Sequence, residues 1–281
     1  MTSELILSGL LQGLVLALVA YAIMIPFRLL NFPDLSSEGA YPLGGALCAS
    51  LIITGVYPIL AIIFASIAAG LVGIATALIH LRFKVNSLLA GIILSTMLYS
   101  VNLRIMGKPN LALFDQPILF LNEIMLSKIL LMFVIIIVFV IPLAIFLRTE
   151  KGLRLRAVGL NPDFAKRQSI CITSYKVLGL FIANCYSGLA GGLMVQLQAY
   201  MDIGMGVGIV IHGLAALMIG EAIIGNETLN KQLLAPLIGA LIYQQIQGMA
   251  INFGLAPSDL KFLTGFIVLS VIAMQKREAS A

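Results

Sequence analysis

The sequence predicts an all-α protein, a polytopic transmembrane helix bundle, from its hydrophobic composition and its scarcity of charge. Of its 281 residues, 60% are hydrophobic and 10% are charged, and the mean hydropathy is +1.08. A water-soluble enzyme is excluded, because soluble domains carry about 25% charged residues. A spanning helix needs ~20 apolar residues, so the chain has room for about nine spans and no separate soluble domain. We therefore expect one transmembrane domain over residues 1–281.

Apolar runs between charged or turn-forming breaks predict the individual spans. The second run is short for a full span, and the seventh carries three glycines, so we expect broken helices, with either of these runs forming a half-helix or a tilted element. The predicted spans cover residues 5–27, 43–56, 58–80, 86–105, 127–147, 174–196, 208–224, 232–252 and 260–274.

The distribution of basic residues predicts the orientation. When the ends of the spans alternate between two sides, thirteen of the seventeen Lys and Arg residues fall on one side and four on the other. Cytoplasmic loops are enriched in Lys and Arg, so the first side is expected to face the cytoplasm. The N-terminus is then outside and the C-terminus is cytoplasmic. The net charge of +5 therefore reflects orientation and not a basic face for nucleic acid.

The densest run of charge, residues 148–167, lies in the long cytoplasmic loop expected at residues 148–172. Asn161 suits a helix N-cap, Pro162 suits the first helical position, and Asp163 complements the positive end of the helix dipole. A short helix is predicted to begin at Pro162. It is either a solvated part of a positively charged anchor or a docking helix for a cytoplasmic partner, since such a capped loop has more structure than charge retention requires.

A second unusual segment, residues 31–45, interrupts two apolar runs. Pro33, Pro42 and three glycines predict that the chain is not continuously helical there. Asp34 and Glu38 would be costly in a membrane unless they line a buried cavity or an aqueous path. The segment is therefore either an ordinary cytoplasmic loop or part of a translocation pathway.

A third break covers residues 200–208 on the outer side, and Gly220, Glu221 and Gly225 follow toward the inner side. Glycine- and proline-broken segments that recur on opposite sides in the two halves of a chain are typical of transporters built from inverted repeats. The sequence is compatible with such a repeat.

No motif for catalysis, metal binding or ATP binding is recognisable. The three cysteines have no metal-ligand or C-x-x-C spacing, and the two histidines, His80 and His212, are far apart in the chain. The sequence has no G-x-x-x-x-G-K-[ST] loop for phosphate and no serine-nucleophile signature. We expect no catalytic residue, no metal and no cofactor in this chain.

Several motifs together resemble the permease subunits of ABC importers of the branched-chain amino acid and ribose type. Residues 149–165 resemble the cytoplasmic coupling loop of that family, and residues 31–39 resemble the break after its first helix. Residues 219–222 and 236–243 are similar to its glycine-rich tract. The resemblance covers nearly the whole chain and is closest to tryptophan/tyrosine-type permeases.

The resemblance implies a transport subunit of the bacterial inner membrane that is not itself an enzyme. Its partners would be the lipid bilayer, a second copy of the chain, a cytoplasmic ABC ATPase dimer that binds ATP and Mg, and an extracytoplasmic solute-binding protein. The solute would be an aromatic or branched-chain amino acid. The implied residues for coupling to the ATPase are Arg154, Arg156, Ala157, Gly159, Asn161, Pro162 and Ala165. Those for the translocation pathway are Asn31, Asp34, Ser36, Ser37, Glu38, Gly220 and Glu221.

Other functions remain open from the residues themselves. A stand-alone secondary transporter or channel would use Asp34, Glu38 or Glu221 to carry an ion or a proton, but it leaves the basic loop without a role. An importer for a sugar or a nucleoside has the same architecture, and a membrane scaffold would need neither polar break.

Overall fold

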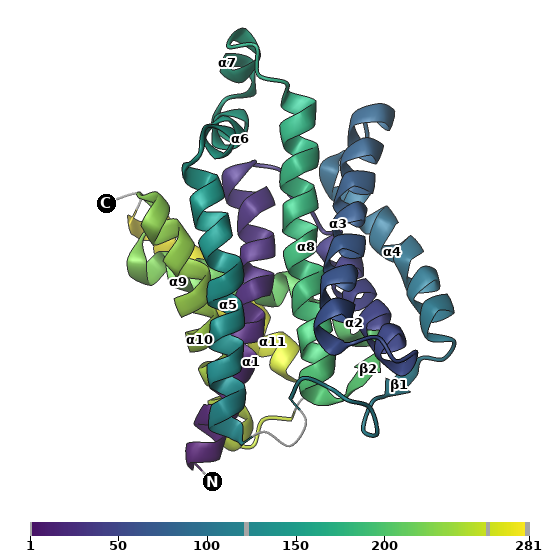
Figure 1. The fold of residues 1–281 in the computed structure, drawn as a ribbon. Helices are drawn as coiled ribbons and strands as arrows, with labels where there is room; N and C mark the ends of the chain where they lie inside the picture. Colours follow the sequence, from purple (N-terminus) through teal and green to yellow (C-terminus); the bar gives the residue numbers. More distant parts are fainter. Residues whose placement is uncertain (1, 121–123, 257–258, 279–281) are drawn as a thin grey trace. The chain divides into compact units, whose positions relative to one another are not determined.

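The computed structural model describes residues 2–120, 124–256 and 259–278. Most of these residues are helical, which confirms the predicted helix bundle (Figure 1). The α-helices are α1 Thr2–Met24, α2 Ser37–Ile53, α3 Pro58–Phe83, α4 Ser87–Met106, α5 Met125–Arg148, α6 Glu150–Leu160, α7 Pro162–Arg167, α8 Ile172–Gln198, α9 Ile209–Ile224, α10 Leu229–Asn252 and α11 Leu260–Glu278. The remaining elements are the π-helix η1 Ile25–Leu29, the 3-10 helix η2 Ile203–Gly206, and the strands β1 Asn110–Ala112 and β2 Tyr200–Asp202.

Seven helical segments among the described residues are long and apolar enough to cross a membrane. The two other predicted spans correspond to α2 and α11, which are not among these seven. Helix α2 has 17 residues, which reach about 26 Å at ~1.5 Å per residue and fall short of a ~30 Å hydrocarbon core. In α11 the apolar stretch is Leu260–Ser270. The count of about nine therefore includes seven full-length candidates and two short ones.

The chain divides into two compact units. Unit 1 comprises residues 1–21, 123–138 and 210–281, and unit 2 comprises residues 22–122 and 139–209. The boundary falls inside α1 and α5 and at the start of α9.

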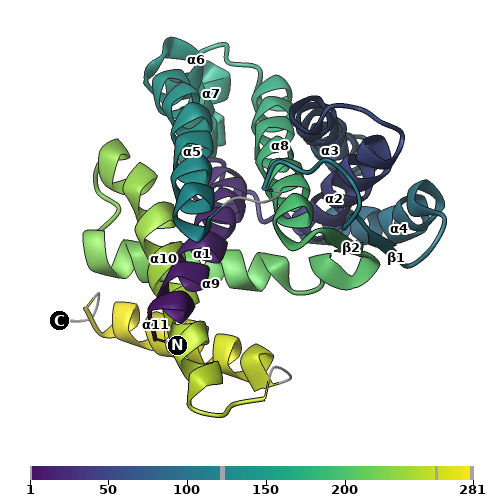
Figure 2. The same ribbon diagram turned by 60° about the horizontal axis from the view of Figure 1, so that its bottom comes forward.

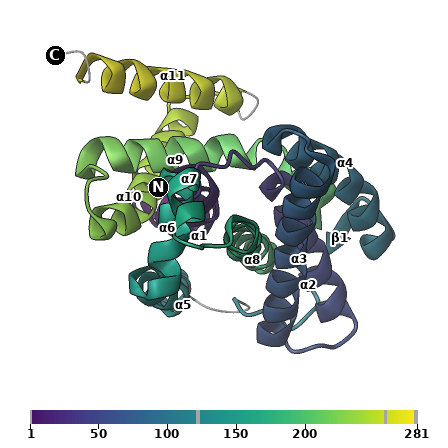
Figure 3. The ribbon, with the colours of Figure 1, turned by 90° about the horizontal axis from the view of Figure 1, so that it is seen from above.

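Unit 2 is built around α8. Helices α2 and α3 pack against it, and α4 packs on their other side (Figures 2 and 3). Glycines bring the helix backbones together, as small residues do between membrane helices. A Cβ atom added to Gly44 of α2 would lie 2.2 Å from the carbonyl oxygen of Gly188 in α8, and one added to Gly73 of α3 would lie 2.0 Å from the carbonyl oxygen of Leu180.

The predicted break after the first helix is present but shorter than residues 31–45. The non-helical part covers residues 30–36, and α2 continues from Ser37 through Pro42. Residues 31–45 are therefore not continuously helical, as expected, but the break ends at residue 36 and not near residue 43, where the second span was predicted to begin. Proline removes only one helical hydrogen bond, the one that the Glu38 carbonyl would accept. The glycines of this segment serve close packing and not a turn. An added Cβ atom would meet α4 at Gly39, α8 at Gly44, and both β2 and α8 at Gly45.

A small antiparallel sheet joins the loop after α4 to the end of α8. Asn110 of β1 is opposite Asp202 of β2, and Ala112 is opposite Tyr200. The third predicted break, residues 200–208, therefore begins with a strand, and three residues are too few for an alternating pattern to reveal it in the sequence.

Unit 1 also relies on backbone contacts between helices. A Cβ atom at Gly220 of α9 would lie 1.9 Å from the carbonyl oxygen of Ala235 in α10, and one at Gly239 of α10 would lie 1.8 Å from that of Ala216. The hydroxyl of Tyr21 in α1 donates a 2.6 Å hydrogen bond to the carbonyl of Leu233.

Candidate functional site

Helices α6 and α7 form a hairpin outside the candidate spans, at one end of α8 (Figure 1). The Asn161 Oδ1 accepts a 2.9 Å hydrogen bond from the backbone N–H of Phe164, and Pro162 occupies the first turn of α7. The predicted N-cap and the helix beginning at Pro162 are thus confirmed. Helix α6 is capped in the same way by Thr149, whose Oγ1 accepts from the N–H of Gly152.

One face of this hairpin packs tightly inside unit 2. Leu155 and Ala165 are fully buried. A Cβ atom at Gly159 would lie 2.0 Å from the carbonyl oxygen of Leu29 in η1, and one at Gly152 would lie 2.3 Å from that of Phe146 in α5. The backbone of α6 therefore rests directly on η1 and on the end of α5.

The opposite face of the hairpin exposes apolar side chains. Leu160 is 86% exposed and Phe164 is 54% exposed, although both belong to short, capped helices. Their neighbours Lys166 and Arg167 are exposed and basic. This face combines an aromatic anchor with positive charge, which is the composition of many protein interfaces.

The predicted coupling residues differ in their surroundings. Arg154 is held by Tyr175 and Glu150, and hydrogen bonds to both side chains raise the pKa of its guanidinium. Arg156 instead donates from Nη2 to the carbonyl of Leu147 at 3.3 Å, and its buried Nε has no partner among the described residues. Of the remaining predicted coupling residues, Gly159 and Ala165 are buried, Ala157 is half-buried, and Asn161 and Pro162 are exposed.

The break before α2 contains a buried polar cluster. Asp34 is 1% exposed, and its Oδ1 accepts from the backbone N–H of Ser36 at 2.8 Å. Its Oδ2 accepts from the Ser36 hydroxyl at 2.6 Å and from Asn184 Nδ2 of α8 at 3.4 Å. The Ser187 hydroxyl donates to the carbonyl of Ser37 at 3.1 Å. These bonds fix the start of α2 on α8.

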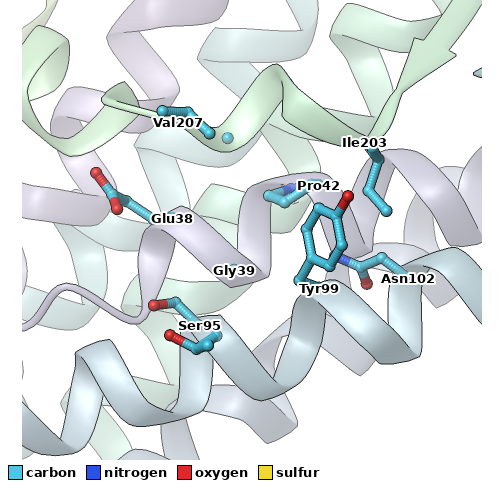
Figure 4. A pocket seen from close by; sticks show the side chains of 10 residues that line it. Glu38, Gly39, Pro42, Ser95, Tyr99, Asn102, Ile203 and Val207 are labelled. Atoms are coloured by element: carbon cyan, nitrogen blue, oxygen red, sulfur yellow. The ribbon is translucent and has the colours of Figure 1, made fainter. Parts of the chain in front are cut away.

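A pocket of about 260 Å³ lies next to this cluster, between α2, α4 and the segment around η2. Figure 4 shows Glu38 toward one end of it and Tyr99 with Asn102 toward the other. The Glu38 Oε1 accepts from the backbone N–H of Gly208 at 3.3 Å. The pocket is lined by Glu38, Gly39, Pro42, Ser95, Thr96, Tyr99, Asn102, Ile203, Gly206 and Val207.

The predicted pathway residues are divided between the two units, and those of unit 2 differ in their surroundings. Asp34, Ser36 and Ser37 are buried in the polar cluster, Glu38 lines the pocket, and Asn31 is exposed in a left-handed backbone conformation with φ 47°. Gly220 and Glu221 belong to unit 1, where both are buried in α9.

Sequence reasoning missed the polar residues of α4. Tyr99 and Asn102 follow Ser95 and Thr96 at intervals of three or four and therefore share one face of a largely apolar helix with them. That spacing was a readable signal of a polar wall. Asn184 gave no such signal, because it is a single amide inside a long apolar run.

Comparison with known proteins assigns the chain to a family. A family model described as the permease component of the branched-chain amino acid transport system matches residues 5–273. The chain belongs to this family. The permease is 36% identical over 268 residues to a tyrosine transport system permease protein of Clostridioides difficile, covering 95% of this chain and 90% of that one. It is thus a multi-pass membrane protein of the ABC-type transport permeases.

Two further relatives resemble the permease. It is 34% identical over 280 residues to an uncharacterized protein of Rickettsia prowazekii, covering 98% of this chain and 99% of that one. It is 28% identical over 205 residues to a nucleoside ABC transporter permease protein of Lactococcus lactis, covering 70% of this chain and 50% of the relative. No solved structure matches it.

Proposed function

We propose that this permease is the transmembrane subunit of an ATP-binding cassette importer for an amino acid. Two copies form the solute pathway in a bacterial inner membrane, with the N-terminus outside and the C-terminus in the cytoplasm. Two partner ATPase subunits bind ATP and Mg, and an extracytoplasmic binding protein delivers the solute.

The exposed face of the α6–α7 hairpin carries this proposal. It presents Leu160 and Phe164 to solvent outside the candidate spans, where an unpaired aromatic side chain serves no folding purpose. Aromatic side chains that enter a partner's pocket dominate binding at protein interfaces. A cytoplasmic ATPase is the partner that the family relationship and the basic charge of the hairpin favour.

Successive contacts inside unit 2 connect the docking face of the hairpin to the pocket. Helix α6 rests on η1 through Gly159 and Leu29. The π-helix η1 leads into residues 30–36, and Asp34 and Ser36 hold the start of α2, which carries Glu38. A rigid displacement of α6 by the ATPase would therefore move the break and the pocket wall together.

The choice of solute follows the relative with the higher identity. The Clostridioides difficile protein is named for tyrosine transport and matches 95% of this chain. The nucleoside permease is less similar and is covered over only half of its own length. We therefore assign an amino acid of the aromatic type in preference to a nucleoside or a sugar.

The proposal is tested by reconstituting the permease with its ATPase subunit and binding protein in liposomes and measuring ATP-dependent uptake of radiolabelled L-tyrosine. Phe164→Ala removes the aromatic anchor and, at about 2 kcal/mol for a hot-spot residue, should weaken ATPase binding by roughly 30-fold. Uptake should fall accordingly while the protein still inserts. Arg156 is less suitable for this test, because its side chain packs inward on Leu147.

Phe64→Ala is the matched control, since Phe64 is 56% exposed but lies within α3, a candidate span. That variant should transport normally. Wild-type uptake in the Phe164→Ala complex would overturn the docking role of the hairpin. Gradient-driven uptake by the permease reconstituted alone, without ATPase, would overturn the importer proposal in favour of a secondary transporter.

A further inference from the structure

The pocket between α2, α4 and η2 contains polar groups that the fold leaves unpaired. Asn102 is 1% exposed, and within the described residues neither its Nδ2 nor its Oδ1 has a hydrogen-bond partner. A buried amide without a hydrogen-bond partner destabilises the folded state. Its side chain lies beside Tyr99 in the pocket wall (Figure 4). A buried, unsatisfied amide facing a cavity indicates that a ligand supplies the missing hydrogen bonds.

The other end of the pocket is anionic. Glu38 lines it with a half-buried carboxylate, whose Oε1 accepts the hydrogen bond from Gly208. Glu38 takes part in neither the Arg154–Glu150 nor the Lys231–Glu227 ion pair, and no Lys or Arg lines the pocket. Ser95 and Thr96 both donate to the carbonyl of Ile92, so their hydroxyl oxygens are left as acceptors. The pocket therefore favours a cation that donates hydrogen bonds.

The volume of the pocket and its aromatic lining narrow the choice of ligand further. A volume of about 260 Å³ corresponds to roughly nine water molecules at ~30 Å³ each, which suits one small solute. Tyr99 offers a ring against which an aromatic solute can pack. Asn102 offers both a donor and an acceptor, which matches a hydroxyl group.

We propose that this pocket is a solute subsite for a small primary alkylamine that carries an aromatic ring. Glu38 binds the ammonium group, Tyr99 packs against the ring, and Asn102 pairs with a ring hydroxyl. This inference rests on the proposed function, because it identifies which part of an aromatic amino acid the permease itself recognises. Selection is then shared between the permease and its binding protein.

The absence of tryptophan from the sequence gives a direct assay. Tyr99→Trp places the single tryptophan of the full chain in the pocket and keeps an aromatic wall. The permease in lipid nanodiscs is titrated with tyramine, phenethylamine and 3-(4-hydroxyphenyl)propionate while tryptophan emission is recorded. The control is Tyr57→Trp, because Tyr57 is 66% exposed and does not line the pocket.

The two amines should give a saturable change in the tryptophan emission of the Tyr99→Trp protein. The propionate lacks the ammonium group and should leave the emission unchanged. Adding Glu38→Gln keeps an acceptor for the Gly208 N–H but removes the charge, and should raise the Kd for both amines at least about tenfold, or 1.4 kcal/mol. Adding Asn102→Leu should remove the tighter binding of tyramine over phenethylamine. The Tyr57→Trp protein should not respond.

The assignment is overturned if the propionate binds as well as the amines, if Glu38→Gln leaves the Kd unchanged, or if no probe changes the emission. Retained size-exclusion profiles and thermal midpoints exclude misfolding as the cause. ATP-driven uptake by the wild-type complex is measured in parallel. If the complex transports L-tyrosine but no probe changes the tryptophan emission, only the subsite is refuted. If the amines bind in the pocket but the complex shows no uptake, only the importer proposal is refuted.

Discussion

Replacing Gly159 by alanine tests whether α6 and η1 move as one body. An added Cβ atom would lie 2.0 Å from the carbonyl oxygen of Leu29 and 2.7 Å from the Cα of Leu30. Favourable contact between non-bonded atoms begins near ~3.5 Å, so α6 must move away from η1 by more than about 1 Å. Both obstructing atoms belong to the backbone, and no side-chain rotation can relieve the overlap.

Two opposing effects determine how much Gly159→Ala changes the free energy of unfolding. Overpacking of this kind costs about 1–3 kcal/mol, and the rigid backbone neighbours place Gly159 at the upper end. Alanine in a helix gains about 0.8–1.0 kcal/mol over glycine. The net expectation for Gly159→Ala is a loss of about 2 kcal/mol in the free energy of unfolding.

The matched control is Gly265→Ala in α11, where no atom lies within 4 Å of the added Cβ. That variant should keep its stability or gain slightly. Thermal midpoints in lipid nanodiscs compare the two proteins, and reconstituted complexes give L-tyrosine uptake per ATP hydrolysed. Gly159→Ala should lower both the midpoint and the coupling ratio. A Gly159→Ala protein with a wild-type midpoint and coupling ratio would refute a rigid α6–η1 contact.

Two further predictions concern the start and the packing of α2. Gly44→Ala should lower the free energy of unfolding by about 2 kcal/mol, because its Cβ atom would lie 2.2 Å from the carbonyl oxygen of Gly188. The control Gly192→Ala has ordinary contacts from 3.4 Å and should change the thermal midpoint little. Equal midpoints for the two variants would contradict the close packing. Asp34→Ala should cost about 1–3 kcal/mol, because it leaves the buried N–H of Ser36 without its acceptor. Asp34→Asn retains an oxygen for that N–H and should lose less, so equal losses in denaturation experiments would argue against this role.

The local signals in the sequence predicted local structure well. The Asn161-Pro162-Asp163 run predicted the start of α7, because capping needs only side chains and backbone groups within one turn. The apolar runs predicted the helices, because a bilayer accepts little else. The break before α2 was also foreseen, but its end was not, since whether Pro42 can stay helical depends on neighbouring helices that the local sequence does not specify.

The candidate site was harder to foresee because its contacts are long-range. Asp34 is predicted to be a pathway carboxylate, and the structure buries it in hydrogen bonds with Asn184 of α8 and with the backbone before α2. Glu38, four residues later, is the carboxylate that lines the pocket. The difference between the two acids comes from which segment packs over each, and only the tertiary structure contains that information.

The hydrogen bond between Glu38 and Gly208 spans 170 positions of the chain, and this has a consequence for biogenesis. At ~5–20 residues per second, synthesis of the intervening segment takes roughly 10–30 s. Throughout that time the Glu38 carboxylate lacks its backbone donor. After residue 106 both α2 and α4 have been made, but η2 has not. The nascent permease must therefore keep a charged group hydrated at the insertion machinery until the last wall of its pocket arrives, and a chain that stalls before residue 203 would present an open, acidic cleft to quality control.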